Sequence, residues 1–147
     1  MKKLPLLFAL LIFACSSGDS SNTNNDFTIS IEFVGQLEIT ESSGLINIQN
    51  QLVSHNDSGG DNEIYIINKE NGSIQSELTV LNSLNIDWED ISIDSNYIYI
   101  GDFGNNYGNR DDLVIYKVTI PTSILSNNQL TEVSQISFNY DNQTNLN

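Results

Sequence analysis

The chain has 147 residues, 19 acidic and five basic side chains, one cysteine and a formal net charge of −14 at neutral pH. Such an acidic surface repels nucleic acid and anionic lipid headgroups and attracts cations. A single cysteine excludes an internal disulfide framework. The length suits one domain with a sizeable hydrophobic core.

Residues 1–14 predict a secretory signal peptide. Lys2 and Lys3 give a positive start, and the apolar run "LPLLFALLIF" follows. That run is shorter than the roughly 20 residues that a membrane-spanning helix needs. The next residue is Cys15, and a Ser/Asn-rich stretch begins directly after it.

The sequence "IFAC" resembles the lipobox of bacterial lipoproteins, in which the cysteine thiol is lipidated and becomes the new N-terminus. The resemblance implies that Cys15 anchors the protein to a membrane, since more than one acyl chain suffices for stable anchoring. Ser16 disfavours retention in the inner membrane under the sorting logic of that family. We therefore expect a cell-envelope lipoprotein at the outer membrane, on its periplasmic side or at the cell surface. The alternative is an ordinary secretory signal with an incidental cysteine.

Residues 15–26 read as a flexible polar linker, and a β pattern begins at Phe27. The stretch "FTISIEFV" alternates apolar and polar side chains, which predicts a strand that continues past Gly35 to Thr40. No stretch has helical spacing over more than about one turn, so the sequence predicts an all-β fold. Further short strands are expected over 45–49, 52–55, 63–68, 74–80, 91–94, 97–101, 113–119 and 132–140.

These strands form an internal repeat. The stretch "SSGLINIQNQLVSHND" aligns with "WEDISIDSNYIYIGD" and places Leu45 on Ile91 and Asp57 on Asp102. A repeat of about 40–50 residues with four strands is the signature of a β-propeller blade. The alternative is a β-sandwich made of two unrelated meanders.

The motifs "NDSGGDNEIY", "DWEDI" and "GDFGNNYGNRDDLVIYKV" resemble a bacterial family of secreted or lipid-anchored β-propeller proteins. The resemblance covers about residues 41–146. It implies that residues 27–147 are a partial propeller, in which a closing strand over 27–40 precedes about two blades. Because two blades leave faces uncovered, we expect either a truncated reading frame or a small domain that covers these faces in another way.

Acidic segments precede the predicted first strand and follow the predicted second strand of each unit. Antiparallel neighbours bring the start of one strand beside the end of the next. This places 41–43 beside 56–58, and 87–90 beside Asp102 and 105–106. Carboxylate and amide oxygens suit a hard cation such as Ca²⁺, whereas the alternative is that these side chains only cap their own turns. The candidate metal ligands are Asp57, Asp61, Glu89, Asp90 and Asp102.

These residues predict a binding module that takes a small molecule, a glycan or a protein, and no nucleic acid. A rival reading is a Ca²⁺-dependent propeller hydrolase acting on a phosphoester, lactone or sugar-derived substrate. In that reading Asp57, Glu89 and Asp102 are ligands, and His55 or Glu89 is the base. Ser54 and His55 cannot form a nucleophile–base pair, because neighbours along a strand point to opposite faces. A third reading is a truncated fragment without function.

Overall fold

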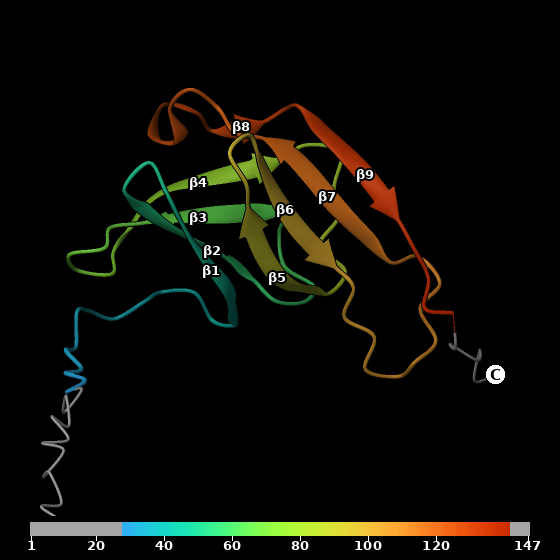
Figure 1. Ribbon diagram of the computed structural model, residues 1–147, viewed down its shortest axis with the longest axis horizontal. Helices are drawn as coiled ribbons and strands as arrows, with labels where there is room; N and C mark the ends of the chain where they lie inside the picture. The colour runs from blue at the N-terminus through green and yellow to red at the C-terminus, as the bar shows by residue number, and fades with distance from the viewer. Residues whose placement is uncertain (1–27, 142–147) are drawn as a thin grey trace, which may run out of the picture. The chain divides into compact units, whose positions relative to one another are not determined.

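The computed structural model describes residues 28–141, and this part of the chain is all-β (Figure 1). Nine strands are joined by turns and loops, with a single short 3₁₀-helix, η1 (Ile124–Ser126). The all-β prediction is thus confirmed. The strands are β1 (Ser42–Ile48), β2 (Gln51–Asn56), β3 (Glu63–Ile67), β4 (Ile74–Val80), β5 (Trp88–Ile93), β6 (Tyr97–Asp102), β7 (Val114–Thr119), β8 (Gln129–Leu130) and β9 (Val133–Ser137).

The strands form two sheets, each built on an antiparallel meander. One sheet has the order β1-β2-β3-β4-β8, and the other has the order β5-β6-β7-β9. The two predicted four-strand units therefore correspond to two separate sheets. The first strand of each begins three residues earlier than expected, because a bulge after Ser43 in β1 and after Trp88 in β5 lets the pairing continue. A bulge inserts an extra residue without ending the ladder.

The hairpin between β1 and β2 shows how local sequence sets the pairing. Gln49 and Asn50 occupy the two loop positions, with φ of 48° and 67°. Two residues with positive φ form the turn whose twist matches that of the flanking strands. This turn fixes the register in which Ile48 pairs with Gln51 and Ile46 with Val53.

The expected strand over 27–40 is not formed in the described part of the chain. Residues 28–39 have no regular secondary structure. Ile29, Ile31 and Phe33 are 72%, 95% and 82% exposed. An isolated alternating segment does not form a strand, because a strand needs a neighbour for its backbone hydrogen bonds, and no strand within residues 28–141 pairs with this one.

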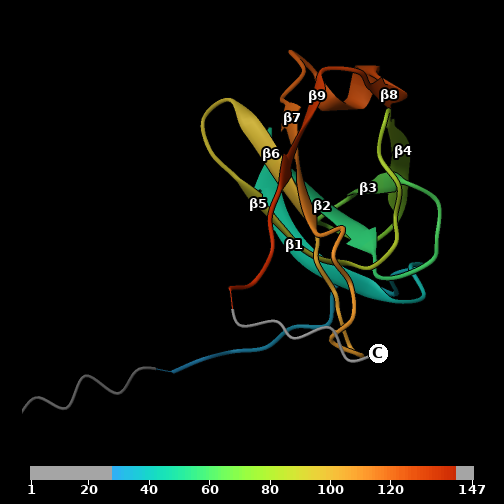
Figure 2. The same cartoon turned by 90° about the vertical axis from the view of Figure 1, so that its right-hand side faces the viewer.

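The predicted strand over 132–140 corresponds to β9, and the short strand β8 that precedes it belongs to the other sheet. β8 pairs in parallel with β4, whereas β9 pairs antiparallel with β7. Only Thr131 and Glu132 separate β8 from β9, so the segment 129–137 connects the outer strands of both sheets (Figure 2).

The two sheets also meet at their first strands, β1 and β5. The Ser43 hydroxyl donates a hydrogen bond of 2.7 Å to the carbonyl oxygen of Glu89. Gly44 has φ of +63°, and a Cβ at this position would lie 2.8 Å from the backbone nitrogen of Ile91. Glycine thus meets two requirements here, a left-handed backbone and a close approach between strands.

Trp88 occupies the centre of the core and is fully buried. Its indole Nε1 donates to the carbonyl oxygen of Leu84 at 2.8 Å. Its ring contacts His55 from the first sheet and Tyr116 from the second, with centroid distances of 5.7 and 6.1 Å. Trp88 therefore acts as a wedge between the sheets. The aliphatic side chains of the same core come from both sheets and include Ile46, Val53, Ile64, Ile66, Leu78, Ile98, Ile100 and Val118.

The signal peptide over 1–14, Cys15 and the linker to residue 26 lie outside the described residues, so these assignments stay predictions. Within residues 28–141, no helix has both the length and the apolar character that crossing a bilayer requires.

Candidate cation-binding site

Three carboxylates from the two sheets converge where β2 ends and β5 begins. Asp57 follows β2 directly, Asp87 precedes β5, and Glu89 is its second residue. One oxygen from each side chain lies within 4.8 Å of the other two. We call this set, Asp57, Asp87 and Glu89, the acidic triad.

Backbone hydrogen bonds hold Asp57 between the inner strands of both sheets. Its N–H donates to the carbonyl oxygen of Glu41 at 2.9 Å, and its carbonyl accepts from Trp88 N–H at 3.2 Å. The next residue, Ser58, forms a single antiparallel bridge with Asp87. The bond to Glu41 confirms the sequence expectation that residues 41–43 lie beside 56–58. The bridge to β5 is a tertiary contact that the pattern did not predict.

The carboxylates of the triad repel one another. Burial, a hydrogen bond with Asp57 and the charge of Asp57 raise the pKa of Asp87, and Arg110 opposes this rise. Burial and the charges of Asp57 and Asp87 raise the pKa of Glu89. All three side chains are half-buried, so water screens the repulsion only in part.

Gly104 closes one side of the triad. Its N–H donates to the carbonyl oxygen of Asp87 at 3.0 Å. A Cβ on Gly104 would overlap the carboxyl groups of Asp87 and Glu89. The absence of a side chain therefore lets the loop after β6 reach the two carboxylates.

Asp102 is a predicted ligand that the structure engages elsewhere. It is fully buried, and its Oδ1 lies 2.9 Å from Nη1 of Arg110 and 3.0 Å from the backbone nitrogen of Asp87. Asp102 therefore supports the backbone of a triad member rather than joining the triad itself. Arg110 also donates to the Gly104 carbonyl oxygen at 2.9 Å, which fixes the loop that covers the triad.

The other predicted ligands lie outside the triad. Asp90 is exposed, and its Oδ1 accepts a hydrogen bond of 2.8 Å from the N–H of Ile91. Asp61 is exposed beyond the Gly59–Gly60 turn. Of the five predicted ligands, the structure brings together Asp57 and Glu89.

His55, a candidate base, is fully buried with its ring against Trp88. Its Nδ1 is 2.9 Å from the carbonyl oxygen of Asn56, and burial lowers the pKa of the imidazole. The His55 ring is thus part of the packed interior beside Trp88.

Asp87 belongs to the triad but is not among the ligands predicted from the sequence. The motif "DWEDI" contained the signal, because residues two apart along a strand share a face. Asp87 and Glu89 have that spacing, whereas Asp90 does not share it. Applying the two-residue period to this motif would have selected Asp87 together with Glu89.

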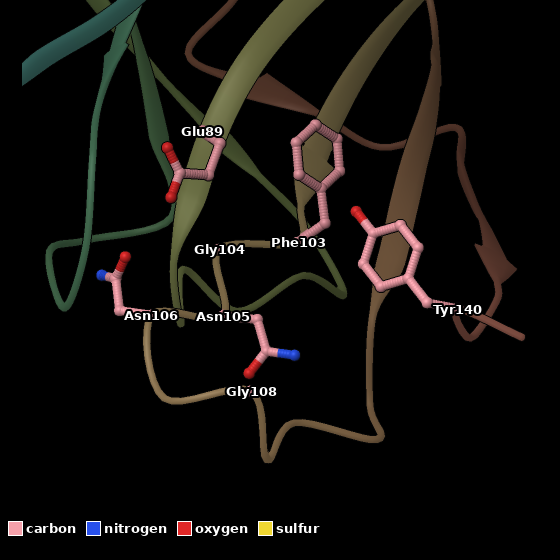
Figure 3. A pocket seen from close by; sticks show the side chains of 7 residues that line it. All are labelled: Glu89, Phe103, Gly104, Asn105, Asn106, Gly108 and Tyr140. Carbon is pink, nitrogen blue, oxygen red and sulfur yellow. The ribbon is translucent and has the colours of Figure 1, made fainter. Parts of the chain in front are cut away.

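Glu89 also lines an open pocket of about 510 Å³ beside the triad (Figure 3). Phe103 and Tyr140 lie on one side of this pocket, and Glu89 lies on the other. The loop after β6 forms its floor with Gly104, Asn105, Asn106 and Gly108.

Three carboxylates supply up to six oxygens when each binds through both atoms. Ca²⁺ takes six to eight oxygens in a flexible arrangement, so the donor set suits this cation, with water or a ligand completing the shell. A search for related proteins found no matching family model, no similar curated protein and no similar solved structure.

Proposed function

We propose that this chain is a cell-envelope lipoprotein whose folded part binds Ca²⁺ through Asp57, Asp87 and Glu89. The observation that carries the proposal is the convergence of these three carboxylates within 4.8 Å. Like charges at this distance cost free energy unless a cation or protons neutralise them. A divalent cation removes that cost.

The charge of the surroundings supports the same proposal. The chain carries 19 acidic against five basic residues. Arg110, whose positive charge opposes the rise in the pKa of Asp87, forms ion pairs with Asp102 and Asp112 at 2.9 and 2.8 Å. Its guanidinium therefore neutralises other carboxylates as well as facing the triad.

We further propose that the two sheets are β-propeller blades. The support is that each sheet contains an antiparallel meander, β1-β2-β3-β4 in one and β5-β6-β7-β9 in the other, and that the first strands of the two sheets lie side by side. Such first strands surround the axis of a propeller, and loops at their ends gather on one face. A β-sandwich is the alternative arrangement of the same two sheets.

Thermal unfolding of the purified protein with Ca²⁺ and with a chelator tests cation binding. We expect Ca²⁺ to raise Tm, because a ligand that binds only the folded state adds about 2.7 kcal/mol at 100 times its Kd. Asp87→Asn should abolish the rise in Tm. Asp61→Asn is the matched control, since Asp61 is exposed and outside the triad. Equal Ca²⁺-induced rises in the two variants would refute the assignment.

One observation favours a second function, that of a Ca²⁺-dependent hydrolase. Glu89 belongs to the triad and also lines the pocket, so its carboxylate lies within reach of both a bound cation and a bound molecule, as a general base requires; burial and the charges of Asp57 and Asp87 raise its pKa. Hydrolysis of a phosphoester or lactone probe should then require Ca²⁺ and disappear in Glu89→Gln. Absence of turnover in a protein that binds Ca²⁺ would leave the binding function alone.

A further inference from the structure

We propose that the pocket beside Glu89 is a saccharide subsite, in which a sugar ring stacks on Tyr140 and Phe103 and its polar groups bind Glu89 and Asn106. The inference deepens the proposed cation-binding function, because Glu89 belongs both to the triad and to the pocket. The cavity of about 510 Å³ lies within the range of roughly 300–1,000 Å³ that small-molecule sites occupy.

Three aromatic rings in mutual contact, Phe103, Phe138 and Tyr140, form and support the apolar side of the pocket. Phe103 contacts Phe138 with a centroid distance of 6.4 Å and an interplanar angle of 67°. Phe138 contacts Tyr140 edge-on at 5.7 Å and 89°. These edge-to-face contacts support each ring from its neighbour, and Tyr140 remains 50% exposed. A supported but accessible aromatic ring offers the flat apolar surface on which the C–H face of a sugar packs.

The side opposite the aromatic rings and the floor of the pocket offer hydrogen-bonding groups. Glu89 presents a carboxylate acceptor, and Asn106 presents an exposed amide that can donate and accept. The Asn105 Oδ1 already accepts from Arg110 N–H at 3.0 Å, and its amide nitrogen points to the side on which Tyr140 lies (Figure 3). A polar wall facing an aromatic wall matches a ring that has one apolar face and hydroxyl groups around its edge.

Charge restricts the class of saccharide. Glu89 and the adjacent Asp57 and Asp87 place up to three negative charges next to the pocket, of which a bound Ca²⁺ would offset two, on a chain of net charge −14. Uronates and phosphorylated sugars would be repelled. The pocket therefore selects neutral or amino sugars, since hydroxyl and ammonium groups both donate hydrogen bonds to Glu89.

Titration calorimetry of the full chain tests the subsite with three probes of similar size: N-acetylated chitotriose, its deacetylated cationic form and trigalacturonate. We expect the first two to bind and trigalacturonate to fail. Tyr140→Ala should weaken binding by about fivefold or more, from the loss of ring stacking. Tyr107→Ala is the matched control, because Tyr107 is 85% exposed on the loop after β6 but does not line the pocket.

Saccharide binding and the Ca²⁺-induced rise in Tm test the saccharide subsite and the cation site separately. If no saccharide binds while Ca²⁺ still raises Tm, the subsite is wrong and the cation site stands. If saccharides bind and Ca²⁺ has no effect, the reverse holds. Equal losses in Tyr140→Ala and Tyr107→Ala, or tighter binding of trigalacturonate, would overturn the inference. Should Tyr140→Ala fail to fold, Asn106→Ala at an exposed position provides the same test.

Discussion

Arg110 and Asp102 form a buried ion pair beside the acidic triad, with 2.9 Å between Nη1 and Oδ1. The Asp102 side chain is completely buried and that of Arg110 is 14% exposed. Arg110 Nη1 also donates a hydrogen bond to the carbonyl oxygen of Gly104, and Asp102 Oδ1 accepts a hydrogen bond from the backbone N–H of Asp87. This pair therefore ties the loop after β6 to the start of β5, and so positions the triad.

Removing Arg110 should destabilise the fold strongly. Arg110→Ala leaves Asp102 buried without its partner, which typically costs about 3–5 kcal/mol. Urea unfolding measures the loss. Asp112→Ala removes the other, 53% exposed partner of Arg110 and should cost about 1 kcal/mol or less. Similar losses of unfolding free energy in the two variants would show that the buried pair with Asp102 stabilises the fold no more than the exposed pair with Asp112.

The triad should give the protein a pH dependence that reverses with Ca²⁺. The raised pKa values of Asp87 and Glu89 mean that the folded state binds protons more tightly than the unfolded chain. Without cations, these groups therefore lower stability at neutral pH. That cost disappears as the pH falls through the raised values towards the ordinary carboxyl pKa of about 4. With Ca²⁺ the trend inverts, because protons compete with the cation.

The difference in unfolding free energy between the unmodified protein and Asp87→Asn isolates this effect from other titrating groups. In chelator at neutral pH, Asp87→Asn should be the more stable, by about 0.5–1 kcal/mol. In saturating Ca²⁺ it should be the less stable. A difference that is independent of both pH and Ca²⁺ would contradict the repulsion within the triad.

Gly104→Ala should weaken Ca²⁺ binding. The added methyl group would overlap the carboxyl groups of Asp87 and Glu89 and force them apart. We expect a Kd for Ca²⁺ that is at least tenfold higher, from a loss of about 1.4 kcal/mol. Gly60→Ala is a suitable control, since the nearest atom to its Cβ would be the side-chain amide nitrogen of Asn56, at 3.3 Å, and no carboxyl group lies within 4 Å among its three nearest atoms. Unchanged Ca²⁺ affinity in Gly104→Ala would place the cation elsewhere.

Trp88→Phe should destabilise the junction of the two sheets. The change removes the hydrogen bond from Nε1 to Leu84 and leaves a cavity beside His55 and Tyr116. We expect a loss of about 1–3 kcal/mol in thermal or urea unfolding. Tyr107→Phe, at an exposed position, should change stability by about 0.5 kcal/mol or less.

Cys15→Ser should release the protein from the membrane fraction of cells that express it. The prediction rests on the resemblance of "IFAC" to a lipobox, because lipidation requires the thiol. Fractionation followed by immunoblotting measures the distribution. Retention of the variant in membranes would mean that another feature anchors the protein.

Local pattern determined most of the secondary structure of this protein. Alternation of apolar side chains marked the strands, and β4 coincides with the predicted range 74–80. Pairing of consecutive strands followed from short turns such as Gln49–Asn50, and it placed Asp57 beside Glu41. These features depend on neighbours in sequence, which is why periodicity and turn residues suffice to predict them.

The tertiary structure decided which carboxylates meet. Asp57 and Asp87 are 30 positions apart, and they are brought together by the contact between β1 and β5, the bridge from Ser58 and the hydrogen bond from Trp88 N–H to the Asp57 carbonyl. Asp102 is buried in an ion pair with Arg110, so it does not belong to the triad. Residues 28–39 form no strand, because no strand of the described residues pairs with them. Sequence pattern specifies the face on which a side chain lies, but its partner across two sheets depends on how the sheets pack.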